Sequence, residues 1–336
     1  MAGIIGYGAY IPKNRLKIDA IAEFLGEDVN EFKRSSGFSE KSVADRDEDI
    51  LTMSYEASKQ AIENSKLEYS DIDSIMFGSD NVENKKGLSS SMIGLLNLNR
   101  NIMASDISSS FKAATSALIL ESGLVDSGLS KNGIVIGVDN LINKGYNQQN
   151  YGNSAGSAAF IIGNGNNNLL DILGSSSYNS NIYDEWNHDG KTFSSGRFGT
   201  KNGYLDSVVN SGNQLLKKLK LQPKDFKYAI FSKPNLALPM SAGKTLGFDN
   251  EQLKDGILFD KIGFAGSASS MIALCNIIEK AKVGDKIFLS SYGNLDGSDS
   301  IAFEVKKEIK PNRNFEHLLG QKNYIRYSDY LDLLNN

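Results

Sequence analysis

Hydrophobic and polar residues follow two patterns along this chain, and together they predict an alternating series of helices and strands. Apolar residues three or four positions apart indicate amphipathic helices, whereas short, almost wholly apolar runs indicate strands covered on both faces. In the first half the expected elements are a strand at 3–12, helices at 15–25, 29–33 and 50–65, a strand at 74–77, a helix at 88–96, a strand at 102–105, a helix at 111–124, and strands at 133–139 and 157–162.

The second half has the same order of elements. The pattern predicts a helix at 204–219, a strand at 228–231, helices at 237–246 and 267–281, and strands at 286–290 and 300–305. An offset of 154 residues links Phe77 with Phe231 and Asn140 with Asn294, and the elements stay in phase although few residues are identical. This predicts a duplicated α/β unit, in which equivalent helix starts meet at a pseudo-twofold axis and can form a shared site.

Four segments follow from this pattern. They are an N-terminal half at 1–165, an insertion of loops with one β segment at 166–203, a C-terminal half at 204–310, and a tail at 311–336. The tail is polar and aromatic, with Tyr324, Tyr327 and Tyr330 spaced by three as on one face of a helix.

Composition narrows the classes of function. With 336 residues, 40% of them apolar, the chain can bury a large core, and its net charge of −4 with interspersed signs offers no cationic surface for nucleic acid. No apolar stretch approaches the roughly 20 residues of a membrane span, and the N-terminus lacks the pattern of a secretion signal. We therefore expect a soluble, cytoplasmic protein. One cysteine and two histidines exclude an internal disulfide and a thiolate zinc site, so no metal is expected.

Several motifs occur in an order and spacing that resemble one enzyme family. They are Gly3-Ile-Ile-Gly-Tyr-Gly-Ala-Tyr-Ile-Pro-Lys-Asn-Arg15, Asp47-Glu-Asp-Ile-Leu-Thr-Met53, Ala155-Gly-Ser-Ala-Ala-Phe-Ile-Ile-Gly163, Gly196-Arg-Phe198, Ser291-Tyr-Gly293 and Gly297-Ser-Asp299. From Met1 to about Tyr330 the chain is similar to hydroxymethylglutaryl-CoA synthase of the archaeal type, in the thiolase superfamily. The resemblance implies a thiolase-like α/β fold with duplicated halves in a layered αβαβα arrangement. It also implies condensation of acetyl-CoA with acetoacetyl-CoA by a cysteine, a glutamate and a histidine.

The position that matches the family's cysteine holds another residue in this chain. The family pattern resembles Asp-x-x-x-x-Cys-Lys-Ala-Gly-Thr, at a helix start whose dipole and exposed amides favour a thiolate. Here the stretch is Asp106-Ile-Ser-Ser-Ser-Phe111-Lys112-Ala-Ala-Thr115, so Phe111 occupies the position of the nucleophile. A phenyl ring cannot form a thioester.

The other two catalytic positions also differ from the family. Its glutamate follows a Gly-Ser pair, and here Gly78-Ser79 leads to Asp80, a carboxylate one methylene shorter. The family's Phe-His-Gln-Pro-Asn corresponds to Phe231-Ser232-Lys233-Pro234-Asn235, which places the neutral hydroxyl of Ser232 where imidazole would move a proton. Asn294-Leu295-Asp296 replaces small residues of a glycine-rich loop. The resemblance thus implies that no catalytic residue is intact, and we expect condensing activity of the synthase type to be absent.

Four positions that match the family are the candidates for substrate binding: Lys112, Arg197, Asn235 and Gly293. The two cations are candidates for a CoA phosphate or a partner, although charged side chains are exposed by default. We expect no cofactor, and a CoA thioester is the candidate ligand.

Other reactive side chains have simpler interpretations. Cys275 lies on an apolar helix face, which favours a buried structural thiol. The serines at 108–110 stand at a helix start without a histidine to activate them, so capping of backbone amides is favoured. His188 and His317 have no evident partner and are expected in a solvated loop and in the tail. For Asp80, helix capping or contact with solvent is favoured over a role as a surviving base.

Three hypotheses of function remain. The first is a non-catalytic homologue that acts as a structural or regulatory subunit of an acyl-CoA-handling complex, with Phe111 filling the end of the pantetheine tunnel. The alternative is an acyltransferase or condensing enzyme with altered chemistry on acyl-CoA or acyl carrier substrates. The third is a module that binds an acyl-CoA or acylated carrier without turnover. The family further implies a homodimer or heteromer, with a thiolase and a small OB-fold bridging protein as partners.

Overall fold

The computed structural model describes residues 1–80, 87–108, 110–141, 151–165, 167–182, 185–188, 191–194, 199–232, 235–294, 296–308 and 314–334. Within these residues, nine strands form one large sheet in the order β11-β12-β13-β8-β1-β7-β6-β4-β5. The strands are β1 (Ala2–Tyr10), β4 (Ser74–Ser79), β5 (Met103–Ser108), β6 (Gly133–Asn140), β7 (Ala155–Asn164), β8 (Leu170–Tyr178), β11 (Tyr228–Phe231), β12 (Lys286–Tyr292) and β13 (Ser298–Val305).

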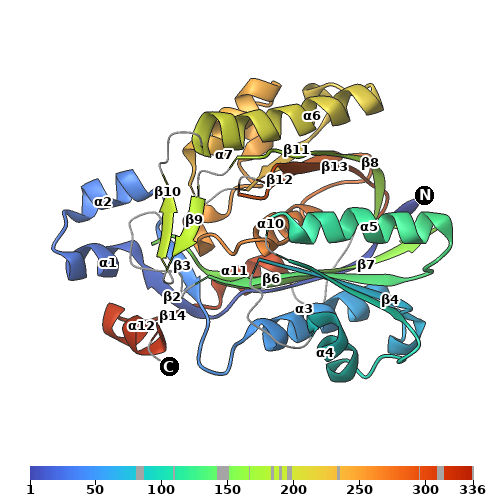
Figure 1. Ribbon diagram of the computed structural model, residues 1–336, viewed down its shortest axis with the longest axis horizontal. Coiled ribbons are helices and arrows are strands. Elements are labelled where there is room, and N and C mark those ends of the chain that lie inside the picture. The colour runs from blue at the N-terminus through green and yellow to red at the C-terminus, as the bar shows by residue number, and fades with distance from the viewer. Residues whose placement is uncertain are drawn as a thin grey trace.

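Helices cover this sheet in layers (Figure 1). The first-half strands lie between α3 and the central pair of helices, and the second-half strands lie between that pair and α6. The outer helices are α3 (Ile50–Ser65) and α4 (Leu88–Leu95) on one side and α6 (Asp206–Leu219) and α7 (Ala237–Leu246) on the other, and the central pair is α5 (Ala113–Ser127) and α10 (Ala268–Ile278). Since α10 is buried along almost its whole length, it forms the centre of the core. The predicted layered α/β fold of two similar halves is confirmed.

The sheet joins the two halves, and it departs from an exact repeat in two places, at β8 and after β5. The halves are joined by a short antiparallel pairing of β1 with β8, at Gly3↔Asp171 and Ile4↔Leu170. β8 lies inside the stretch predicted as an insertion, yet it pairs along its length with β13 and is a central strand. At the position in the second half that corresponds to β5, 154 residues later, the chain forms the short helix α9 (Phe259–Ile262) instead of a strand. The second half therefore contributes one strand fewer to the sheet.

A small second sheet joins distant parts of the chain. β2 (Asn14–Lys17) pairs antiparallel with β3 (Glu40–Val43) and parallel with β14 (Asn323–Tyr324). Arg15, predicted to begin a helix, is therefore a strand residue, and the helix α1 begins at Ile18. The prediction that three tyrosines share one helical face is wrong at Tyr324, which lies in β14, because its backbone pairs with β2 instead of continuing a helix.

The remaining elements are short. They are α1 (Ile18–Leu25), α2 (Val29–Ser36), η1 (Tyr69–Asp71), β9 (Glu185–His188), β10 (Lys191–Ser194), η3 (Gly199–Leu205), η4 (Pro223–Asp225), α8 (Asn250–Leu253), α11 (Phe315–Gly320) and α12 (Tyr327–Leu334). β9 and β10 pair as a hairpin, so residues 166–203 hold more than the one predicted β segment. None of the helices formed by the described residues has the length and apolarity that crossing a membrane requires.

Candidate functional site

The two central helices begin near each other, and each is held by a carboxylate from the opposite half. Asp139, at the end of β6 in the first half, accepts hydrogen bonds from the backbone N–H (2.7 Å) and hydroxyl (2.8 Å) of Ser267 before α10. Asp299, on β13 in the second half, accepts one from Ser116 in the first turn of α5 (2.6 Å). Both carboxylates are buried, at 0% and 1% exposure. Negative charge at a helix N-terminus is favourable, so the reciprocal contacts fix both helix starts.

Asp139 also holds the end of β4. It accepts hydrogen bonds from the hydroxyl of Ser79 (2.8 Å) and the backbone N–H of Asp80 (2.9 Å). Burial raises the pKa of Asp139 to about 6, and the negative charge of Asp80 adds to the rise, whereas the hydrogen bonds from Ser267 and Ser79 oppose it. The predicted site residue Asp80 is thereby positioned, through its backbone, at the junction of β4, β6 and α10.

The carboxylate of Asp80 lies near two others. Its charge raises the pKa of Asp139 and also that of Asp296, for which burial is the larger cause. Gly78, two residues earlier, packs against the backbone of Ala113 and Ala114, so the end of β4 touches the first residues of α5. The end of β4, which leads into Asp80, therefore lies beside the start of α5.

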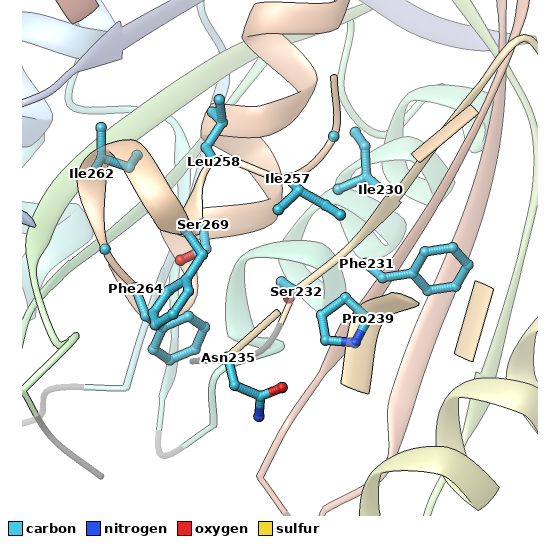
Figure 2. Close-up of a pocket in the computed structure, with 13 residues that line it drawn as sticks. Ile230, Phe231, Ser232, Asn235, Pro239, Ile257, Leu258, Ile262, Phe264 and Ser269 are labelled. Atoms are coloured by element: carbon cyan, nitrogen blue, oxygen red, sulfur yellow. The ribbon is translucent and has the colours of Figure 1, made fainter. Parts of the chain in front are cut away.

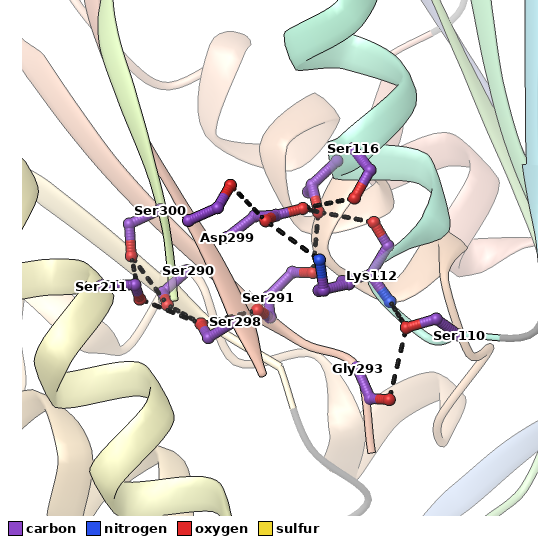
Figure 3. A network of polar contacts seen from close by, with 12 residues as sticks. Ser110, Lys112, Ser116, Ser211, Ser290, Ser291, Gly293, Ser298, Asp299 and Ser300 are labelled. Atoms are coloured by element: carbon purple, nitrogen blue, oxygen red, sulfur yellow. Dashed lines mark hydrogen bonds and ion pairs between the residues drawn. The ribbon is translucent and has the colours of Figure 1, made fainter. Parts of the chain in front are cut away.

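Asp299 is the centre of a larger polar network (Figure 3). Besides Ser116, it accepts hydrogen bonds from Thr115 (3.2 Å) and Ser177 (2.7 Å), and it forms an ion pair with the ammonium of Lys112 (3.3 Å). The network continues through buried serine hydroxyls on α6, β12 and β13, namely Ser211, Ser290, Ser291, Ser298 and Ser300. Lys112, a predicted substrate-binding residue, thus has an internal partner.

Phe111 lies in the turn before α5 and is half-buried. Its ring packs edge-on against the ring of Phe264, with 5.1 Å between centroids and 89° between planes. Phe264 is fully buried and precedes α10. Our sequence interpretation missed this residue; the offset of 154 pairs residue 111 with Ala265, the residue next to it.

On its other side, Phe264 lines a small cavity of about 30 Å³ (Figure 2). Ser232 and Asn235 line the same cavity, together with apolar side chains from β11, α7 and α9. The N–H of Ser232 donates to the carbonyl of Ser290 (3.3 Å), and the side-chain oxygen of Asn235 accepts from the N–H of Leu238 (2.9 Å) at the start of α7. This volume holds one or two water molecules, whereas ligand sites usually measure about 300 to 1,000 Å³.

Gly293 and Ser110 close the site at the start of α5. The hydroxyl of Ser110 donates to the carbonyl of Gly293 (3.3 Å) and accepts from the N–H of Lys112 (3.4 Å), the residue before α5, so it binds one amide ahead of the helix and none within its first turn. A side chain at Gly293 would clash with the Ser110 hydroxyl and with the stem of Lys112. The predicted residues Phe111, Lys112 and Gly293 therefore lie together, and Ser232 and Asn235 lie beyond Phe264.

The other candidates lie elsewhere. Cys275 is buried in α10, where burial raises the pKa of its thiol, and the predicted structural role agrees with this placement. His317 is exposed on α11 and contacts Gln321 (2.9 Å). Ser108 is exposed at the end of β5. Ser109, Arg197 and the side chain of His188 lie outside the described residues. The part of the chain that the structure describes contains no group of three His, Cys, Asp or Glu side chains that could hold a metal ion.

Comparisons with known proteins place the chain in a family. Residues 216–294 match the model for the C-terminal part of 3-oxoacyl-[acyl-carrier-protein (ACP)] synthase III. Among solved structures, the curacin biosynthetic HMG synthase in complex with its apo donor-ACP has a TM-score of 0.88 at 18% identity, covering 99% of this chain and 88% of that one. The 3-oxoacyl-[acyl-carrier-protein] synthase III of Aquifex aeolicus VF5 has a TM-score of 0.81 at 22% identity, covering 90% of this chain and 100% of that one.

The sequence relatives are more similar. The hydroxymethylglutaryl-CoA synthase of Methanobrevibacter smithii is 34% identical over 98% of this chain and 97% of its own length. That of Methanocaldococcus jannaschii is 32% identical, again over 98% of this chain and 97% of its own length. With a thiolase-like fold and full-length relatives above 30% identity, this chain belongs to the hydroxymethylglutaryl-CoA synthase family.

Proposed function

We propose that this chain is a non-catalytic homologue of hydroxymethylglutaryl-CoA synthase and serves as a structural or regulatory subunit of an acyl-CoA-handling complex. The observation that carries the proposal is the phenyl ring of Phe111 at the start of α5, packed against Phe264. Covalent acyl transfer needs a nucleophile at this point, and a phenyl ring has no lone pair to attack a thioester.

Among the described residues around the first turn of α5, the hydroxyls and the ammonium are all bonded to other groups. Around the first turn of α5, the hydroxyl of Ser110 is bonded to Gly293, and Lys112, Thr115 and Ser116 are bonded to Asp299. A serine or threonine needs an adjacent general base for attack. Thr115 and Ser116 donate to a carboxylate already shared by four donors, whereas Ser110 also has a hydrogen bond with the carboxylate of Asp296. The small cavity beyond Phe264 also lacks the volume for a substrate acyl group with its pantetheine arm.

We further propose that the chain assembles through β5. This strand ends the large sheet, and among the described residues it pairs only with β4. Most of its residues are exposed, including Met103 at 48%. An open edge strand offers unpaired backbone groups to another chain, which supports a homodimer or heteromer formed there. A thiolase and a small OB-fold bridging protein are the further partners that we propose, by analogy with the family.

A second candidate is an acyltransferase or condensing enzyme with altered chemistry on acyl-CoA or acyl carrier substrates. It is favoured by the carboxylates of Asp139 and Asp296, which both lie near that of Asp80, and by the hydrogen bond between Asp296 and Ser110. With a pKa raised by burial to about 6, Asp139 is a stronger base than an ordinary carboxylate. Its four hydrogen bonds tie it to the scaffold, however, so we rank this candidate second.

A turnover assay separates the two candidates. The purified chain is incubated with acetyl-CoA and acetoacetyl-CoA, and release of CoA thiol is followed with a chromogenic reagent. We expect a rate equal to that of buffer, while the synthase of Methanobrevibacter smithii serves as the active reference. Enzyme-dependent CoA release that Asp80→Asn abolishes would establish the second candidate. Purification of the chain from its native source with a thiolase bound would support the subunit role.

A further inference from the structure

The C-terminal residues wrap around the edge of the small sheet. The N–H groups of Asn323 and Ile325 donate to the carbonyls of Lys13 (2.9 Å) and Arg15 (3.1 Å), so β14 extends the sheet at β2. The chain then turns into α12, whose Tyr327 packs on Phe24 of α1 with 4.4 Å between ring centroids. We call residues 321–334 the C-terminal strap.

The strap holds both faces of the sheet. Because side chains alternate along a strand, the neighbours Glu40 and Lys41 of β3 point to opposite faces. On one face the hydroxyl of Tyr324 donates to Glu40 (2.9 Å), which also pairs with Lys322. On the other face Tyr330 of α12 covers Lys41, with 3.0 Å from the ammonium to the hydroxyl and 4.3 Å to the ring centroid.

Lys41 is an unusual residue for such a position, since it is only 1% exposed. Among the described residues, the hydrogen-bond partner of its ammonium is Tyr330, and no carboxylate forms an ion pair with it. Burial of a cation without an opposite charge is costly, and here it lowers the pKa of Lys41 to about 7. Besides Glu40, the charged side chains on β2, α9 and α12 are Arg15, Lys17, Asp260, Lys261, Asp329 and Asp332. None of these groups is a cause of the lowered pKa, for which burial alone accounts.

β3 connects the strap to the candidate site. The hydroxyl of Ser42 donates to the carbonyl of Ile262 (3.2 Å), and a Cβ at Gly263 would lie 2.9 Å from the Cβ of Lys41. Ile262, Gly263 and Phe264 line the cavity that also contains Ser232. A single strand thus separates the strap from the wall of the cavity.

We propose that the C-terminal strap is a releasable cover over β3, that its release is coupled to uptake of a proton by Lys41, and that release loosens the cavity wall at 262–264. We take Gly320, the last residue of α11, as the hinge of the strap, because glycine is the residue least restricted in backbone conformation. Before the hinge, α11 stays anchored, because Phe315 is buried and its N–H donates to Glu279 (2.7 Å). The inference concerns access to the site and does not rest on whether the site is catalytic.

The direction of the pH effect follows from linkage. In the closed state Lys41 loses its proton near pH 7, whereas in the released state it is hydrated and keeps its proton up to about pH 10.4. Between these values release takes up a proton, so the released fraction falls about tenfold for each unit that the pH rises. Below pH 7 Lys41 is protonated in both states, so the released fraction no longer depends on pH.

Trypsin cleavage after Arg326 in the full-length chain measures release, because this bond lies within the strap. Rates at pH 7 and pH 9 are followed by mass spectrometry and divided by the rate on a short peptide substrate. In the wild type we expect at least about a tenfold decrease at pH 9. Lys41→Met should abolish that decrease, and Lys261→Met, at an exposed lysine on α9, should keep it. A wild-type rate without pH dependence, or the same dependence in Lys41→Met, would overturn the proposal.

A second measurement at fixed pH tests the link to the site. Ile262→Cys places a thiol in the cavity wall at a position that is only 2% exposed, so its labelling by a neutral thiol reagent at pH 7 reports how readily the wall opens. Adding Lys41→Met removes the buried charge, so we expect labelling to slow severalfold, whereas adding Lys261→Met should leave it unchanged. Equal labelling rates with and without Lys41→Met would show that the strap does not act on the site, and the proposal would fail.

Discussion

Replacing Asp299 by alanine is expected to lower the free energy of unfolding by about 3 to 5 kcal/mol. The carboxylate accepts hydrogen bonds from three hydroxyls and pairs with the ammonium of Lys112, at a point where it is almost fully buried. Its removal leaves the largely buried cation of Lys112 and the hydroxyls of Ser116 and Ser177 without this acceptor, whereas Thr115 keeps the carbonyl of Lys112. Chemical denaturation of the variant and the wild type measures the loss.

A matched control is Asp19→Ala. Asp19 pairs with Lys33 at 2.6 Å, but the two side chains are 41% and 42% exposed. Solvent screens an exposed pair, so its loss should cost less than about 1 kcal/mol. Similar losses for the two variants would contradict the structural role that we assign to Asp299.

The second large effect on stability concerns the aromatic pair of Phe111 and Phe264. Phe264→Ala should lower the free energy of unfolding by about 3 to 5 kcal/mol, because the ring is fully buried and its loss enlarges the neighbouring cavity. Phe111→Ala should cost clearly less, since its ring is only half-buried. The double variant should lose less than the sum of the single losses, by about 0.5 to 1.5 kcal/mol, because each single variant already breaks the edge-on contact.

A double-mutant cycle by chemical denaturation measures this coupling. Phe226 provides the control, since it lies in the aromatic cluster of the second half with Phe248 and Phe288. Its replacement by alanine should add to Phe264→Ala within about 0.5 kcal/mol. If the losses for Phe111→Ala and Phe264→Ala also added within about 0.5 kcal/mol, the contact between the two rings would not stabilise the protein as we propose.

Much of the fold could be predicted from the sequence, because its strands and helices have clear local patterns. The strand Tyr228–Phe231 and the helix Ala237–Leu246 were predicted with their observed bounds, since both are apolar segments with polar or glycine-containing boundaries. The errors occur where pairing between distant residues decides the structure. β2, β3 and β14 bring together residues near 15, 42 and 324, and no local pattern at Arg15 or Tyr324 indicates this contact.

The candidate site could be predicted only in part. Phe111, Lys112 and Gly293 were predicted as site positions from motifs, and they lie together at the start of α5. The partner of Lys112 is 187 positions away, and the partner of Phe111 comes from the second half, so neither contact was visible in a local motif. The reciprocal roles of Asp139 and Asp299 depend on how the halves pack, which the sequence pattern did not reveal.

The formation of an acyl-protein intermediate tests the central claim most directly. The purified chain is incubated with radiolabelled acetyl-CoA, denatured, and counted after removal of free label, with the synthase of Methanobrevibacter smithii as the active reference. Because Phe111 offers no atom that can attack the thioester, we predict no label above the level of heat-inactivated protein. Label that survives denaturation in an amount approaching one acetyl group per chain would contradict the account.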